Sequence, residues 1–281
     1  MSQKPSLFAR PSRGRPVKPG AVYGVPGQGN TLWLSLLSIA ALLFAWWLVT
    51  FMGWVKPLFV PAPMTVLQKF LSIWDTGFTG TPFLEHVGIS TARVFGAFIL
   101  ACVIGIPLGL VMGMSPVMRG LLDPPIEFYR PIPPLAYLPL MIIWFGIGET
   151  SKVLLIFLSV FAPIVLGARS GVKSAAIEQI HAAYSFGASR WQVLRHVILP
   201  SALPEILTAM RIGIGFGWTT LVAAEMVAAT KGVGYMVLSA SQFLQTPVVI
   251  MGIFVIAFIA FAFDLFMRLM IQRLVPWKGR M

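Results

Sequence analysis

The chain has 281 residues, of which 57% are hydrophobic and only 11% are charged. A soluble domain carries about 25% charged residues, so this composition argues against a soluble enzyme and against a disordered chain. The net charge of +12 would indicate nucleic-acid binding in a soluble protein. In a membrane protein such an excess lies in cytoplasmic loops, so we expect a lipid bilayer and no nucleic acid as partner.

The first thirty residues differ from the rest of the chain. Residues 1–30 are rich in Pro, Gly, Arg and Lys, which predicts a mobile basic cytoplasmic tail. The apolar run that follows is too long for the core of a signal peptide, and no small-residue cleavage site comes after it. We therefore expect a retained helix over 31–52 and a transmembrane domain over 31–281.

Gaps between charged residues predict five further spans, because a membrane-spanning helix needs about 20 mostly apolar residues. The expected helices are 90–113, 124–147, 151–170, 203–227 and 247–270. Within 124–147, Pro131, Pro133, Pro134 and Pro139 must kink or break the helix. The fold class is therefore an all-α polytopic membrane protein with six transmembrane helices.

The distribution of basic residues predicts the orientation. Fifteen Lys and Arg fall on the side of the two termini and of the segment after the fourth helix, whereas the opposite loops hold Lys56, Lys69, Lys152 and Lys231. Arg93 lies at the edge of the second helix. Because basic residues concentrate on the cytoplasmic side, both termini should be cytoplasmic.

Small residues recur every four positions in the second predicted helix. They are Ala97, Ala101, Gly105, Gly109 and Gly113. They share one face, which lets another helix approach closely. We favour packing within the chain, and a subunit interface is the alternative.

The cytoplasmic loop 171–200 is too long for a tight turn. Its apolar spacing predicts a short helix that Ser174 caps and Gly187 ends. Ser189 and Gln192 then form a capping box for a second short helix, which Pro200 closes. This pair of helices either lies on lipid or forms a rigid elbow that docks into a partner.

The sequence HAAYSFGASRWQVLRHVILP at 181–200 resembles the signature of permease subunits of bacterial ABC importers. That signature is Glu-Ala-Ala, three residues, Gly, nine residues, Ile, one residue and Leu-Pro. Here His181 replaces the Glu and Val197 replaces the Ile. By this resemblance the loop docks to an ATPase through His181, Ala182, Ala183, Gly187, Ala188, Ser189, Leu199 and Pro200.

The segments Asp123–Lys152 and Gly217–Val237 are similar to the taurine, sulfonate and nitrate branch of these permeases, and most of all to its taurine members. The resemblance implies a type I importer fold in the bacterial inner membrane. It also implies a homodimer, two cytosolic ATPases that bind ATP and Mg, and a periplasmic substrate-binding protein. The expected substrate is a small sulfonate such as taurine, with an alkanesulfonate or nitrate as alternatives.

Ionisable residues inside a span are costly and usually face a cavity or a partner. Arg211 and Glu225 lie fourteen residues apart and so near one face of their helix. With Arg130 they are the candidate residues of a translocation path, and the alternative is a structural pair or an interfacial position. Asp264 and Arg268 should form a surface pair.

The sequence does not favour a metal site, a nucleotide site or an ion-driven transporter. The three histidines have no partners at metal-ligand spacing, so we expect no metal. The GIGETSK segment lacks the order of a phosphate loop, so ATP should bind another polypeptide, and this chain should hold no cofactor and be no enzyme. A secondary transporter driven by an ion gradient is the rival function, but the inverted repeats typical of that class are not visible.

Overall fold

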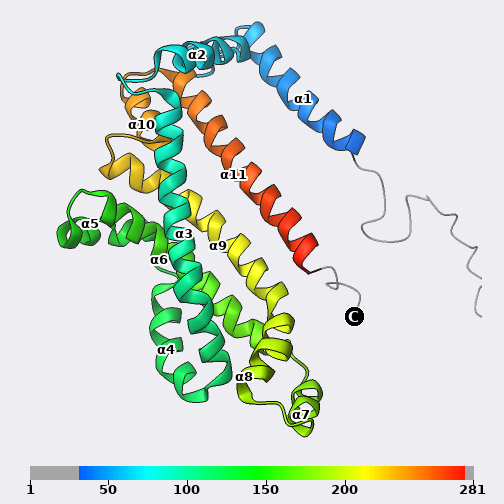
Figure 1. Cartoon of the computed structure of the whole chain (residues 1–281). Coiled ribbons are helices and arrows are strands. Elements are labelled where there is room, and N and C mark those ends of the chain that lie inside the picture. Colours follow the sequence, from blue (N-terminus) through cyan, green and yellow to red (C-terminus); the bar gives the residue numbers. More distant parts are fainter. Residues whose placement is uncertain (1–31, 276–281) are drawn as a thin grey trace, which may run out of the picture. The chain divides into compact units, whose positions relative to one another are not determined.

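The computed structural model describes residues 32–275, and over these residues it consists of helices and connecting loops (Figure 1). The chain divides into two units, one up to Trp54 and the other from Val55 onward. The described helix of the first unit is α1 (Leu32–Phe51), which contains no charged residue. The predicted tail 1–30 lies outside the described residues.

Four long helices organise the second unit. They are α3 (Phe83–Met114), α6 (Glu149–Val172), α9 (Leu199–Ala228) and α11 (Thr246–Leu274). Their apolar side chains meet in one core, in which Val94, Val160 and Leu221 are buried. Since each helix contributes a buried stripe, the second unit is a packed bundle of α3, α6, α9 and α11 (Figure 1).

Within the described residues, five helices are long and apolar enough to cross a membrane. They cover Trp33–Phe51, Phe83–Met114, Glu149–Val172, Arg190–Ala228 and Thr246–Leu274. Most run beyond the expected bounds. Glu85 and Glu149, for example, lie inside α3 and α6 but outside the ranges 90–113 and 151–170, because the expected ranges followed the apolar runs.

The expected third span, 124–147, is not one helix. The chain forms α4 (Pro116–Tyr129) and α5 (Pro134–Phe145), with a break between them. Proline gives no backbone N–H to a helix, so the prolines from Pro131 to Pro134 stop the hydrogen-bond ladder. At 12 residues, α5 is about 18 Å long, which is short of the hydrocarbon thickness of about 30 Å.

The small-residue face of α3 packs against α6 of the same chain. Ala97 and Ala101 are fully buried. A Cβ placed on Gly105 would lie 3.2 Å from Ile164 Cγ2, and Gly109 faces the backbone of Val165 and Arg169. The interpretation as packing within the chain is therefore confirmed, and this face is not free to form a subunit interface.

Shorter helices connect the long ones. They are α2 (Pro63–Thr76), α7 (Ile177–Ser185), α8 (Arg190–Val193), the π-helical turn η1 (Leu194–Ile198) and α10 (Val233–Gln242). In Figure 1, α7 and α8 lie at one end of the bundle, and α2 and α10 lie at the other. Each end of the bundle therefore carries a different set of short helices.

Candidate functional site

The elbow between α7 and α8 contains the residues of the signature. Gly187 has φ +80°, a left-handed conformation that favours glycine. Gln192 N–H donates to Ser189 Oγ at 3.3 Å, and Ser189 N–H donates to Gln192 Oε1 at 2.7 Å. The capping box is therefore confirmed. Ser174 does not cap α7, because the residue before that helix is Ala176 and no side chain caps it.

The second short helix does not end at Pro200. It runs through α8 and η1 directly into α9. A π-helical turn bonds five residues back, and here Leu199 N–H donates to the carbonyl of Leu194. Pro200 follows this π-helical turn directly, and it has no N–H to donate to the carbonyls before it. The elbow and the membrane helix are thus one continuous element.

Apolar rings project from this elbow. Phe186 is 92% exposed, and Trp191 is 67% exposed. His181, Ala182 and Ser189 are exposed with them, and α7 buries none of its residues. Aromatic side chains of this kind are the usual anchors of protein interfaces, so the elbow presents a surface suited to a partner.

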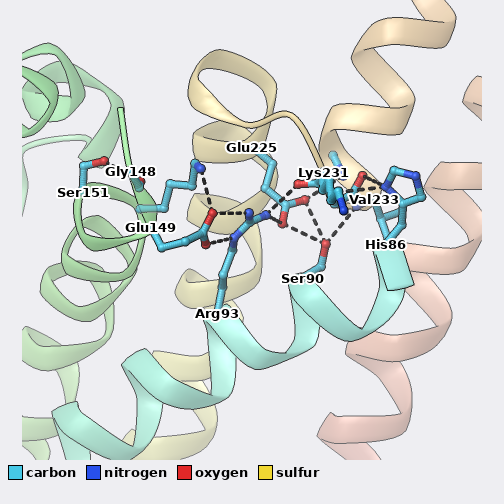
Figure 2. A network of polar contacts seen from close by, with 12 residues as sticks. His86, Ser90, Arg93, Gly148, Glu149, Ser151, Glu225, Lys231 and Val233 are labelled. Carbon is cyan, nitrogen blue, oxygen red and sulfur yellow. Dashed lines mark hydrogen bonds and ion pairs between the residues drawn. The ribbon is translucent and has the colours of Figure 1, made fainter. Parts of the chain in front are cut away.

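At the opposite end of the bundle, a network of charged groups joins α3, α6 and α9 (Figure 2). Arg93 donates through Nη1 to Glu225 Oε1 at 2.6 Å, and through Nε and Nη2 to the carboxylate of Glu149 at 2.6 and 2.7 Å. Lys152 Nζ also donates to Glu149, at 3.0 Å. Two cations and two carboxylates are thereby paired.

Glu225 is almost fully enclosed, with 1% of its surface exposed. Besides Arg93, it accepts hydrogen bonds from Ser90 Oγ at 2.8 Å and from Gly234 N–H at 2.8 Å. A buried carboxylate needs such compensation, because leaving water costs it several kcal/mol. The geometry makes Glu225 the centre of a clamp that holds the start of α10 against α3.

The α9–α10 connection is held by the same clamp. Gly232 N–H donates to His86 Nδ1 at 3.0 Å, and Val233 N–H donates to Ser90 Oγ at 2.8 Å. A Cβ on Gly232 would lie 2.5 Å from the Glu225 carboxylate, and its φ is +127°. Glycine is therefore needed there. His86, at 0% exposure, is therefore part of this clamp.

Arg211 belongs to a separate cluster. Its Nε and Nη2 donate to Asp264 of α11 at 2.5 and 3.1 Å. Arg268 Nε donates to the same carboxylate at 2.8 Å, so the expected Asp264–Arg268 pair is present but shared. Arg211 and Glu225 thus lie on one helix with different partners, and they do not form a common site.

Arg130 lines a cavity of about 200 Å³ at the break between α4 and α5. Its other walls include Tyr129, Tyr137, Ser159 and Phe216. The Tyr129 hydroxyl donates to the carbonyl of Leu158 at 3.5 Å. The cavity combines one cation with hydroxyl groups and rings, which is a suitable lining for a small polar ligand.

Sequence reasoning missed Arg93, Glu149 and Ser90. It placed Arg93 at a helix edge, whereas α3 begins ten residues earlier, at Phe83. One signal for this ion pair was available in the sequence. Arg93 and Glu225 have opposite charges, and each lies next to an apolar run. Among residues 32–275, no three His, Cys, Asp or Glu gather as a metal site.

The model of the family described as binding-protein-dependent transport system inner membrane component matches residues 105–276. The chain belongs to this family. It is therefore a transport component of the inner membrane, and the family match includes the break at Arg130, the elbow and α9.

Two relatives are similar over nearly the whole of this permease. The taurine transport system permease protein TauC of Escherichia coli (strain K12) is 56% identical over 88% of the chain and 90% of its own length. The aliphatic sulfonates transport permease protein SsuC of Bacillus subtilis (strain 168) is 34% identical over 92% and 93%. Both belong to the branch that the sequence resembles.

A solved structure supports the fold. A chain of the MetNI methionine ABC transporter, in a structure of inward-facing conformations, superposes with a TM-score of 0.60 at 17% identity. It covers 68% of this permease and 95% of the MetNI chain. The all-α permease fold expected from the sequence is therefore confirmed.

Proposed function

We propose that this permease carries a small sulfonate, taurine first, as the membrane subunit of an ATP-driven importer. The observation that supports this most strongly is the 56% identity to a taurine permease, against 34% to a permease for aliphatic sulfonates. An alkanesulfonate or nitrate remains the alternative substrate. An ion-coupled secondary transporter is not favoured, because the relatives are ABC permeases.

The partners follow from the family. A binding-protein-dependent system needs a substrate-binding protein on the periplasmic side and a source of energy on the cytosolic side. We expect two copies of this chain and two ATPase subunits that bind ATP and Mg, with both termini of the permease in the cytoplasm. The proposed docking surface for the ATPase is the elbow, with Gly187 at its turn and Phe186 exposed beside it.

The continuity of the elbow with α9 supports a mechanism of alternating access. When ATP draws the two ATPases together, they move the elbow. Because no break separates α8 from α9, this motion reaches the outer end of the same helix. There Glu225 ties α9 to Arg93 of α3. The elbow and the clamp thus couple the cytosolic end of the bundle to its outer end.

Reconstitution tests this function. The permease, its ATPase and its binding protein are placed in liposomes, and uptake of labelled taurine, ethanesulfonate, sulfate and nitrate is measured with and without ATP. Taurine uptake that requires both ATP and the binding protein is the expected result. Uptake driven by an ion gradient without ATP would refute the proposal in favour of a secondary transporter.

A further inference from the structure

We propose that the cavity between α4 and α5 binds a zwitterionic sulfonate by both of its charged ends. Arg130 holds the sulfonate, and the wall formed by α6 holds the ammonium group. This assignment rests on the proposed function, and it names the residues that recognise the substrate during passage.

Arg130 differs from three arginines of the second unit whose guanidinium groups are paired. Arg93, Arg169 and Arg211 each have a carboxylate partner. Within residues 32–275, the Arg130 guanidinium has no hydrogen bond or ion pair, and Arg130 alone is charged among the residues that line the cavity. A guanidinium without a counterion at a cavity wall attracts an anion, and its planar N–H groups match an oxyanion in two-point contact.

The wall of the cavity that α6 forms supplies hydrogen-bond acceptors. Pro163 lies inside α6 and has no N–H to give to the carbonyl of Ser159 four residues earlier. The Ser159 hydroxyl donates to the carbonyl of Ile156 at 2.7 Å, so its oxygen keeps lone pairs for another donor. Both Ser159 and Pro163 line the cavity. An ammonium group, which has three donors and no acceptor, fits these oxygen atoms.

Aromatic rings complete the site. Tyr129, Tyr137 and Phe216 line the same cavity, and ring faces attract an ammonium group by cation–π interaction. The break that opens the cavity is made of prolines, which have little freedom to move. A ligand with one charge of each sign would meet complementary groups in a preformed space, whereas sulfate or nitrate would meet only Arg130.

Charge replacement at a single position tests the site. Cys102 is the chain's one cysteine, so a Cys102→Ala background leaves no other thiol in the permease. Arg130→Cys in this background should lower ATP-driven taurine uptake about tenfold to a hundredfold, the value of a hydrogen bond to a charged group. A thiosulfonate reagent that attaches an aminoethyl group should restore uptake, and one that attaches a sulfonatoethyl group should not.

Matched controls separate charge from structure. Arg119→Cys alters an exposed arginine of α4 that does not line the cavity, and neither reagent should change its uptake. Pro163→Ala returns an N–H to the helix and should lower taurine uptake severalfold, whereas Pro107→Ala in α3 should not. Arg130→Lys, which keeps the charge, should retain more uptake than Arg130→Gln.

The results distinguish this proposal from the proposed function. If the Cys102→Ala parent imports no taurine with ATP, the function itself is wrong. If the parent imports taurine and Arg130→Cys does so equally well, or both reagents act alike, the function stands and the two-ended site is refuted. Should Arg130→Cys fail to assemble, equal uptake by Arg130→Lys and Arg130→Gln refutes the site.

Discussion

Replacement of Arg93 by leucine should destabilise the permease more than the loss of any exposed ion pair. Arg93 is 5% exposed, and its partner Glu225 is 1% exposed. Arg93→Leu leaves the Glu225 carboxylate buried with Ser90 Oγ and Gly234 N–H as remaining donors. Removing one partner of a buried ion pair costs about 3–5 kcal/mol, because the remaining charge has neither water nor a counterion.

Glu149 adds little to this cost. Its side chain is 61% exposed and keeps Lys152 as a partner, so solvent screens the charge that Arg93→Leu would leave behind. The matched control is Arg268→Leu, which removes an exposed partner of Asp264. Such surface pairs contribute about 0–1 kcal/mol. The clamp and the control should therefore differ severalfold in their effect on stability.

The assay is thermal unfolding of the purified permease complex, followed by loss of the monodisperse peak in size-exclusion chromatography. For a chain of this size about 1 kcal/mol corresponds to about 2–4 °C, so Arg93→Leu should lower the melting temperature by about 6–20 °C. The double variant Arg93→Leu/Glu225→Leu should recover part of this loss, because no unpaired charge remains. Equal melting temperatures for Arg93→Leu and Arg268→Leu would refute the clamp.

The remaining predictions concern the elbow, the orientation and the α9–α10 connection. Gly187→Val should leave the permease in the membrane but weaken co-purification of the ATPase, because a side chain in the left-handed conformation costs about 1–2 kcal/mol; Gly120→Val, in open space on α4, is the control, and equal co-purification would contradict the docking role. A periplasm-active reporter should work when fused near Gly80 and be silent just after Lys173, and the reverse pattern would invert the topology. Gly232→Ala should lower the melting temperature, since its Cβ would lie 2.5 Å from the Glu225 carboxylate; an unchanged value would show that the connection relaxes freely.

The sequence by itself determined the fold class and the elbow between α7 and α8. Both depend on local patterns: apolar runs long enough to span a bilayer, and the capping box at Ser189 with a glycine before it. The breaking prolines near Pro131 were also visible, because proline acts on its own helix regardless of what packs around it. Similarly, the four-residue spacing of small residues identified the face of α3 that α6 covers.

Tertiary structure alone decided which charges meet. Arg211 and Glu225 share a helix face by arithmetic, yet Arg211 pairs with Asp264 of α11 and Glu225 with Arg93 of α3. Partners of this kind are far apart in the chain, and no helical spacing connects them. The same holds for Arg130, whose position at a cavity depends on how α6 and α9 pack against the break. Ion pairs and cavities form between elements, so they follow from packing that no single segment of sequence contains.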